Sequence, residues 1–137
     1  MSYLLDTNVI SELRKGGRCN PGVAAWFAGV PPEDIYLSVL TLGEIRKGIE
    51  NIRRRDPSAA EALEDWLHEL EGSLADNLLL VDQAIAEQWG RFNVPDPLPM
   101  LDSLLAATAS VHGMTLITRN LKDVERTGVE CLNPFSP

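Results

Sequence analysis

The sequence predicts a single α/β domain, residues 1–137, in which a parallel sheet carries helices on both faces. Three observations lead to this prediction. The chain has 137 residues, which is a usual size for one domain. Hydrophobic residues make up 45% and charged residues 23%, a balance typical of a folded globular protein. Short apolar runs alternate with segments of helical periodicity, and this alternation is typical of a parallel sheet covered by helices.

Five short apolar runs are the predicted strands. Each is only a few residues long, as expected of strands in a buried parallel sheet. In chain order they cover residues 2–5, 35–39, 78–81, 114–117 and 129–132.

The helices between these strands are predicted from capping residues and from apolar spacing. Thr7 or Asn8 can cap the first helix. Pro21, directly after Asn20, favours the start of the second, and Gly113 ends the long apolar one. Apolar residues at helical spacing mark the helices between them. In chain order the predicted helices are 7–13, 20–27, 41–54, two that begin at 56 and 82, 100–112 and 121–126.

The charge of the chain argues against general binding to nucleic-acid backbones. Twelve Lys and Arg face twenty Asp and Glu, giving a formal net charge of −8. The segment 56–76 carries acids and no base, which predicts a solvated helix face. The basic residues gather elsewhere in small groups, so a local basic surface remains compatible with the sequence.

The sequence shows neither a membrane span, nor an export signal, nor a Cys/His zinc site. Its apolar runs are far shorter than the roughly 20 residues of a membrane-spanning helix, so no membrane partner is expected. No basic segment precedes an apolar stretch at the start, so we expect a cytoplasmic protein. The two cysteines and two histidines are isolated from one another, which excludes a Cys/His zinc site.

Three acids stand where an α/β sheet places its site. Asp6 ends the first strand, Glu44 lies in the first turns of the helix after the second, and Asp102 lies early in a mostly apolar helix. Each also has a plain structural explanation, respectively a helix cap, a surface side chain and a partner of the helix dipole. Together, without His or Cys, they predict an all-oxygen site for Mg²⁺ or Mn²⁺, which suits phosphodiester hydrolysis.

Four segments together carry a family resemblance. They are LLDTNVISEL at 4–13, LTLGEIRKGI at 40–49, LDSLLAATASVHGMTLITRNLKDVE at 101–125 and NPF at 133–135. In order and spacing they resemble the PIN-domain ribonucleases, in particular VapC-type toxins of type II toxin–antitoxin pairs. The resemblance covers nearly the whole chain. It implies a parallel sheet between helices, a homodimer, cleavage of tRNA or rRNA, and a small cognate antitoxin whose tail covers the active site.

The resemblance also assigns roles to individual residues. It places the metal-binding acids at Asp6, Glu44 and Asp102, with a fourth position at Asn120 or Asp123. The predicted catalytic residues are therefore Asp6, Glu44, Asp102 and Asp123. The residues expected to position substrate or water are Thr7, Asn8, Thr118 and Asn120. The candidate RNA contacts are Arg14, Arg46, Lys47 and Arg119.

The predicted function is that of a Mg²⁺-dependent endoribonuclease toxin, which cleaves RNA with a metal-activated water. Two alternatives stay open. One is a non-catalytic PIN scaffold that binds RNA or protein, although such a scaffold has no need of three clustered acids. The other is a small Mg²⁺-dependent phosphatase, although Asn8 stands where a D-x-D phosphatase beginning at Asp6 has its second acid.

Overall fold

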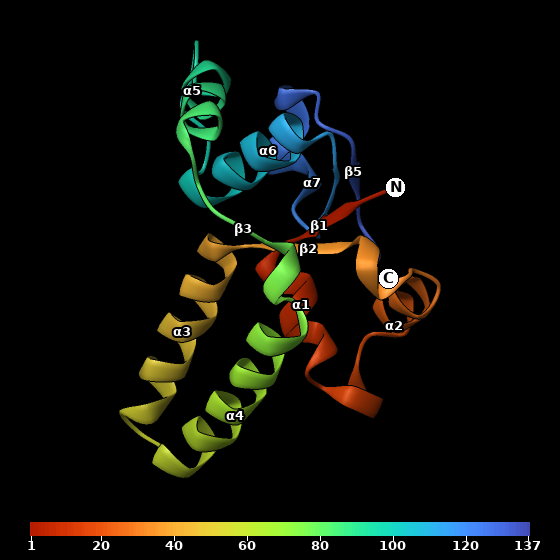
Figure 1. Ribbon diagram of the computed structural model, residues 1–137, viewed down its shortest axis with the longest axis vertical. Helices are drawn as coiled ribbons and strands as arrows, with labels where there is room; N and C mark the ends of the chain where they lie inside the picture. The colour runs from red at the N-terminus through yellow and green to blue at the C-terminus, as the bar shows by residue number, and fades with distance from the viewer.

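Five short parallel strands form the centre of the computed structural model, which describes residues 1–137 (Figure 1). The strands are β1 (Tyr3–Leu5), β2 (Ile35–Ser38), β3 (Leu78–Leu79), β4 (Thr115–Ile117) and β5 (Cys131–Leu132). They pair in the order β3-β2-β1-β4-β5, and every pairing is parallel. The predicted fold class is therefore confirmed.

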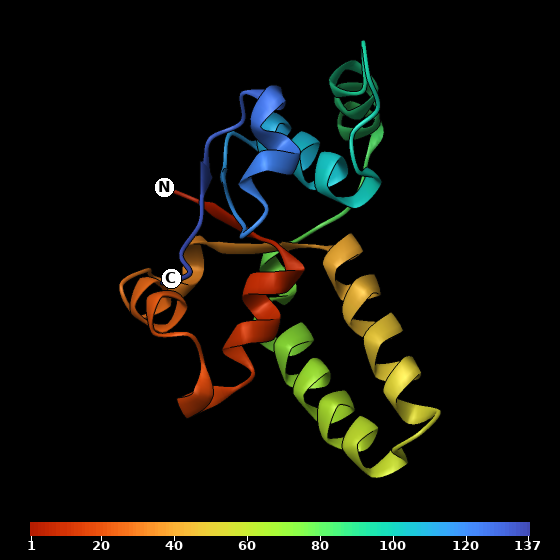
Figure 2. The same ribbon diagram turned by 180° about the vertical axis from the view of Figure 1, so that it is seen from behind.

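Seven α-helices connect and flank the strands. They are α1 (Thr7–Leu13), α2 (Pro21–Ala28), α3 (Val39–Arg53), α4 (Pro57–Ser73), α5 (Gln83–Phe92), α6 (Met100–His112) and α7 (Leu121–Val124). The helices α1 to α4 lie on one side of the sheet and α5 to α7 on the other, as both views show (Figures 1 and 2). None of the helices combines the length and the apolar character needed to cross a membrane.

Several predicted boundaries are wrong by one or two residues. Val39 belongs to α3 rather than to β2, because the Ser38 hydroxyl caps the helix by accepting a bond from the Leu40 amide at 3.1 Å. The third strand ends at Leu79, and the next two residues, 80 and 81, are exposed. The last strand starts at Cys131 rather than at 129. The α1 cap is Asp6, not Thr7 or Asn8.

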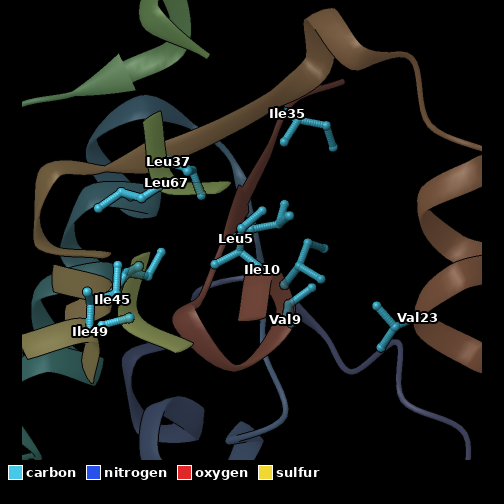
Figure 3. Close-up of a cluster of buried hydrophobic side chains, with 11 residues drawn as sticks. Leu5, Val9, Ile10, Val23, Ile35, Leu37, Ile45, Ile49 and Leu67 are labelled. Atoms are coloured by element: carbon cyan, nitrogen blue, oxygen red, sulfur yellow. The ribbon is translucent and has the colours of Figure 1, made fainter. Parts of the chain in front are cut away.

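Adjacent residues of β1 send their side chains to opposite faces of the sheet and so build two cores. Leu5 belongs to a cluster with residues of α1, α2, α3 and α4 (Figure 3). Leu4, on the other face, belongs to a cluster with Leu105 of α6 and Leu116 of β4. Leu4 and Leu5 are both fully buried. The central strand is thus held from both sides, which fixes the position of the residue that follows it.

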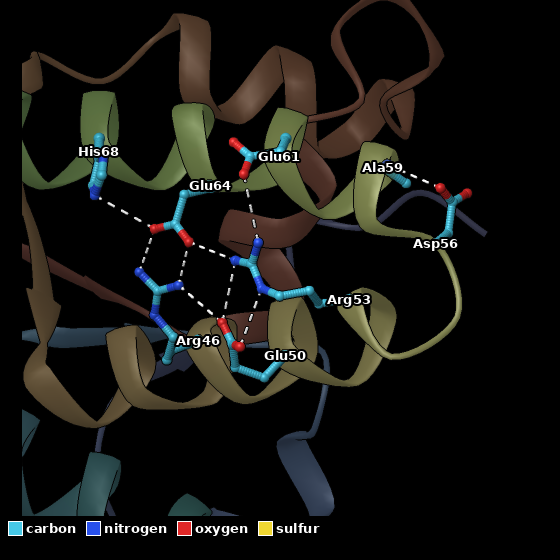
Figure 4. A network of polar contacts seen from close by, with 8 residues as sticks. All are labelled: Arg46, Glu50, Arg53, Asp56, Ala59, Glu61, Glu64 and His68. Atoms are coloured by element: carbon cyan, nitrogen blue, oxygen red, sulfur yellow. Dashed lines mark hydrogen bonds and ion pairs between the residues drawn. The ribbon is translucent and has the colours of Figure 1, made fainter.

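The helices α3 and α4 form a hairpin that projects away from the sheet and is held by ion pairs (Figures 1 and 4). The Arg46 guanidinium pairs with both carboxylate oxygens of Glu64, at 2.6 and 2.5 Å. Arg53 reaches the same carboxylate at 2.7 Å. The prediction of a purely solvated acidic face on α4 is therefore wrong at Glu64, which is a partner of α3.

Candidate active site

Asp6 is the residue directly after the central strand, and it is only 4% exposed. Its Oδ1 accepts a hydrogen bond from the Thr7 amide at 2.6 Å, which makes Asp6 the N-cap of α1. Its Oδ2 accepts a bond from the Thr118 hydroxyl at 2.7 Å. Burial raises the pKa of Asp6. Its hydrogen bonds act in the opposite direction and lower the pKa, while the nearby charge of Glu44 raises it further.

The strand register explains the contact between Asp6 and Thr118. Leu5 is opposite Ile117 in the β1–β4 pair, so the next residue of each strand stands side by side at the carboxyl edge. The Thr118 hydroxyl also accepts a bond from the Asn120 amide at 3.0 Å. Thr118 thus joins the acid to the segment that follows β4. The Thr118 hydroxyl therefore binds the Asp6 carboxylate directly, which is a contact beyond its predicted role in positioning substrate or water.

Asn8 connects the same two segments from the side of α1. Its side-chain amide donates to Asp6 Oδ2 at 3.3 Å, and its Oδ1 accepts from the Arg119 amide at 3.2 Å. Thr7 contributes its backbone amide to the cap, while its buried hydroxyl oxygen has no hydrogen-bond partner. Both residues therefore lie at the predicted site.

Asp102 lies in the first turn of α6 and is half-buried. Its pKa is raised to about 6, first by burial and then by repulsion from Asp6 and Asp123. Contact with the Asn120 side chain acts in the opposite direction. The residues that influence Asp102 are Asp6, directly after β1, and Asn120 and Asp123 at the start of α7, so the fold brings three distant segments together here.

Glu44 and Asp123 complete the acidic group from two further helices. Glu44 is exposed in the second turn of α3, and Asp123 is half-buried in α7. None of the four acids, including Asp6 and Asp102, forms an ion pair with a Lys, Arg or His side chain. The acids are thus neighbours whose negative charge is not balanced by the protein.

The chemistry of this donor set fits a hard divalent cation. Carboxylate and amide oxygens are the ligands that Mg²⁺ and Mn²⁺ prefer, and no His or Cys lies among them. Burial is the first cause of the raised pKa of Asp102, and repulsion from Asp6 and Asp123, which a cation would relieve, is the next. No three acidic, His or Cys side chains are close enough to hold one ion between them as the side chains now stand. The donors fit in kind and in charge, and their final arrangement around an ion requires side-chain movement.

The predicted RNA contacts fall into two groups. Arg14 at the end of α1 and Lys47 on α3 are exposed and form no ion pair, so they are available to a ligand. Arg46, in contrast, is engaged within the protein, because its guanidinium is bound by Glu64 and Glu50, and these bonds raise its pKa.

Arg119 lies beside the site and stacks on the C-terminal segment. Its guanidinium carbon is 4.1 Å from the centre of the Phe135 ring. Its charge also lowers the pKa of Glu12, after the larger effects of the Lys15 and Asn20 hydrogen bonds. Its stacking on Phe135 thus holds Arg119 at the rim of the acidic group.

Two residues near the site were not predicted from the sequence. Ser38, fully buried, caps α3 and so orients the helix that carries Glu44. Its place directly after an apolar run and before a helix is a capping signal that could have identified it. Thr41 is buried with its hydroxyl oxygen unpartnered, and no sequence pattern indicates this.

The fold and the site together define an α/β protein with an all-oxygen acidic site at the carboxyl edge of a parallel sheet. The family model of the PIN domain matches residues 3–129, and the chain belongs to this family. It is 30% identical over 138 residues to VapC ribonuclease Y4jK of Sinorhizobium fredii, an alignment that covers 98% of each chain. It is 31% identical over 142 residues to Toxin FitB of Neisseria gonorrhoeae, covering 96% of this chain and 97% of FitB. Among solved structures, FitAcB from Neisseria gonorrhoeae superposes with a TM-score of 0.88 at 29% identity, covering 96% of this chain and 97% of that one.

Proposed function

We propose that this protein is a metal-dependent endoribonuclease and the toxin of a type II toxin–antitoxin pair. The observation that carries the proposal is the group of unpaired acids around Asp6 and Asp102, at the carboxyl edge of a PIN-domain sheet. Two full-length relatives support it by their names, one a ribonuclease and the other a toxin. The proposed ion is Mg²⁺, with Mn²⁺ as a substitute.

Each acid has a proposed role. Asp6 and Asp102 hold the ion directly, and Glu44, which is exposed, orients the attacking water with its carboxylate. The bound ion supplies a more acidic water and stabilises charge on the phosphate in the transition state. Thr118 and Asn8 keep the Asp6 carboxylate in place through the hydrogen bonds described above.

The fourth ligand position is divided between Asn120 and Asp123. The Asn120 amide oxygen can orient a water or bind the ion weakly, because it carries no charge. Asp123 raises the pKa of Asp102, so it is close enough to contribute charge to the same site. Neither residue is proposed as a primary ligand.

The proposed partners are a cognate antitoxin, a second copy of this chain, and RNA, either tRNA or rRNA. The unpaired acids are suited to receive an Arg or Lys of the antitoxin, since a cation there replaces the charge of the metal. A homodimer is checked by light scattering at micromolar concentration, where a monomer contradicts it. An antitoxin complex that leaves the acids uncovered contradicts the proposed inhibition.

The central experiment compares RNA cleavage by the wild type, Asp6→Asn, Asp102→Asn and the control Asp65→Asn on exposed α4 surface. With Mg²⁺ we expect the two site variants to lose cleavage and the control to keep it, while circular dichroism shows an unchanged fold. EDTA should abolish wild-type cleavage.

The outcome also separates the alternatives. RNA binding without cleavage by the wild type indicates a scaffold, and hydrolysis of p-nitrophenyl phosphate in place of RNA indicates a phosphatase. Cleavage by Asp6→Asn or Asp102→Asn at nearly the wild-type rate contradicts the metal assignment.

A further inference from the structure

The basic residues of α3 and of the turn after it are divided between two faces. The chain places five there, namely Arg46, Lys47, Arg53, Arg54 and Arg55. Figure 4 shows two of them, Arg46 and Arg53, pointing to acids of α4 and to Glu50. The other three form no ion pair.

The three unpaired bases follow the face of α3 that carries Glu44, with Lys47 on the helix and Arg54 and Arg55 directly after its last residue, Arg53. At 3.6 residues per turn, Lys47 follows Glu44 by one turn and Asn51 follows Lys47 by another. Arg54 and Arg55 come one turn after Asn51. Asn51, Arg54 and Arg55 line one shallow surface pocket, so the structure places them together at the tip of the α3–α4 hairpin.

A second element borders the same face. A cavity of about 110 Å³ between α1, α3 and α4 is lined by Arg14 and Gly48 together with apolar residues. Gly48 has open space where a Cβ would stand, so the α3 backbone is accessible at this point. Arg14 is exposed and free of ion pairs, and it adds positive charge beside α3 at the level of Gly48.

The location of these charges is unusual for this chain. Its net charge is −8, and most of its surface therefore repels a polyanion. The acids of α4 neutralise one side of α3 and leave the opposite side basic. The free bases thus form a positive strip that begins at Lys47, one turn after Glu44 of the acidic site, and ends with Arg54 and Arg55 at the tip of the α3–α4 hairpin, which lies far from the sheet (Figure 1).

We propose that this strip, formed by Lys47, Asn51, Arg54 and Arg55 with Arg14 at its side, is the surface along which the RNA backbone leaves the active site. The proposal rests on the ribonuclease function proposed above and adds a binding surface to it. From Glu44 to Arg55 the helix rise spans about 16 Å, enough for several phosphates. Lysine and arginine neutralise phosphates, and the Asn51 amide can donate to their oxygens. The acidic site alone would repel RNA, and the strip supplies the attraction that holds it there.

The test measures RNA binding separately from cleavage. Full-length Asp6→Asn, with Mg²⁺, is titrated into fluorescein-labelled bulk tRNA and followed by anisotropy between about 50 and 200 mM salt. Adding Arg54→Gln and Arg55→Gln should weaken binding about 10-fold near 0.1 M salt. The slope of log K against log salt should fall by about 2, since two phosphate contacts are lost.

The control adds Arg18→Gln and Arg91→Gln to the same background, which removes equal charge from α5 and from the segment after α1. We expect the control to change the affinity by less than about twofold, since its residues lie off the strip. The proposal is overturned if the tip variant binds as tightly as its parent, or if the control loses as much affinity.

Measuring both RNA cleavage and tRNA binding distinguishes a wrong RNA-binding surface from a wrong ribonuclease assignment. A wild type that cleaves RNA, with a tip variant that binds tRNA normally, rejects the strip alone. A wild type that does not cleave RNA, with binding that depends on Arg54 and Arg55, supports the strip and rejects the nuclease.

Discussion

Asp6 combines a structural role as a helix cap with the proposed role of a metal ligand. One oxygen caps α1, and the other is held by Thr118 and Asn8. Burial acts against ionisation while these donors favour it, so the group is restrained in position without an opposing charge. Asparagine at this position can keep the cap through its amide oxygen, which is why Asp6→Asn is a conservative test of chemistry.

Asp102→Asn should stabilise the metal-free protein at pH 7. The folded-state pKa of Asp102 is raised to about 6, so its favourable contribution is present below the unfolded pKa of about 4 and is lost as the pH rises through 6. At pH 7 the charged form therefore destabilises the fold. After a discount for solvent screening we expect a gain of about 1 kcal/mol in the free energy of unfolding.

Urea unfolding in EDTA at pH 7 and pH 4 measures this effect. The gain should shrink at the lower pH, where Asp102 is protonated in the folded protein. Asp65→Asn is the matched control and should be neutral. An Asp102→Asn protein that is less stable than the wild type at pH 7 shows that Asp102 has a favourable partner in the fold.

Asp123→Ala should lower RNA cleavage less than Asp6→Ala and should leave tight metal binding in place. Asp123 acts on Asp102 from α7, whereas Asp6 lies at the end of the central strand with its carboxylate held by three donors. Asn120→Asp should be tolerated, because it adds a charge that a second ion could use. Calorimetric titration with Mn²⁺ decides the ranking. Complete loss of binding in Asp123→Ala makes that residue a primary ligand.

The helix α3 is the element on which structure and proposed function meet. One face packs Ile45 and Ile49 into the core, a second binds the acids of α4, and a third carries the free bases. Successive residues of a helix are rotated by about 100° around its axis. Residues on the three faces therefore make their contacts independently. Substitutions on one face should therefore leave the others intact.

Glu64→Gln should weaken the α3–α4 hairpin at neutral pH. The hydrogen bond from Arg46 is the first cause of the low pKa of Glu64, about 2. A lowered pKa stabilises the fold above the unfolded value of about 4.5, and this contribution is lost as the pH falls toward 2. The urea midpoint of the variant should be below that of the wild type at pH 7, and the difference should vanish near pH 2.

The control for this experiment is Glu61→Gln. Glu61 is exposed and stands 3.7 Å from Arg53, so its pair is screened by solvent and contributes little. Equal effects of the two substitutions would mean that the close pairing of Glu64 is not what stabilises the hairpin.

At the scale of the whole molecule, the C-terminal segment is fastened to the start of α2 and reaches the rim of the site. Asn20 Oδ1 accepts bonds from the Ser136 amide at 3.0 Å and from the Gly22 amide at 3.0 Å. Phe135, next in the chain, stacks under Arg119. The last residues thus support the side chain of Arg119, which directly follows Thr118 in the chain.

Gly22→Ala should destabilise the protein by about 1–3 kcal/mol through overpacking. A Cβ at position 22 would stand 2.5 Å from the Ser136 nitrogen and nearer still to the Pro134 carbonyl oxygen, both backbone atoms. Hydrogen exchange should become faster at the backbone amides of Phe135 and Ser136, which are hydrogen-bonded in the wild type. Gly48→Ala, where a Cβ meets open space, should instead be neutral or stabilising by up to about 1 kcal/mol. If these two amides of the Gly22→Ala variant exchange as slowly as in the wild type, the C-terminal segment shifts to make room for the added methyl group.

Much of this molecule follows from local patterns in the sequence. The bounds of α6 were predicted correctly, because an uninterrupted apolar helix ending at Gly113 is a local signal, and Gly113 adopts a φ of 66°. The positions of Asp6 and Glu44 near strand ends also follow from the order of elements, since parallel strands end at one edge. The edges of the short strands were missed, because a strand end depends on its neighbours rather than on its own residues.

Pairings between distant residues were decided only by the tertiary structure. Thr118 meets Asp6 because β1 and β4 align Leu5 with Ile117, a register that neither strand specifies alone. Arg46 meets Glu64 because α3 and α4 pack as a hairpin, and this gives an acidic partner to a base that the sequence cannot distinguish from the unpaired Lys47. The sequence by itself therefore determined which residues have the chemistry. The packing of helices and strands decided which of them stand together, because contacts across the chain depend on where the two cores place each element.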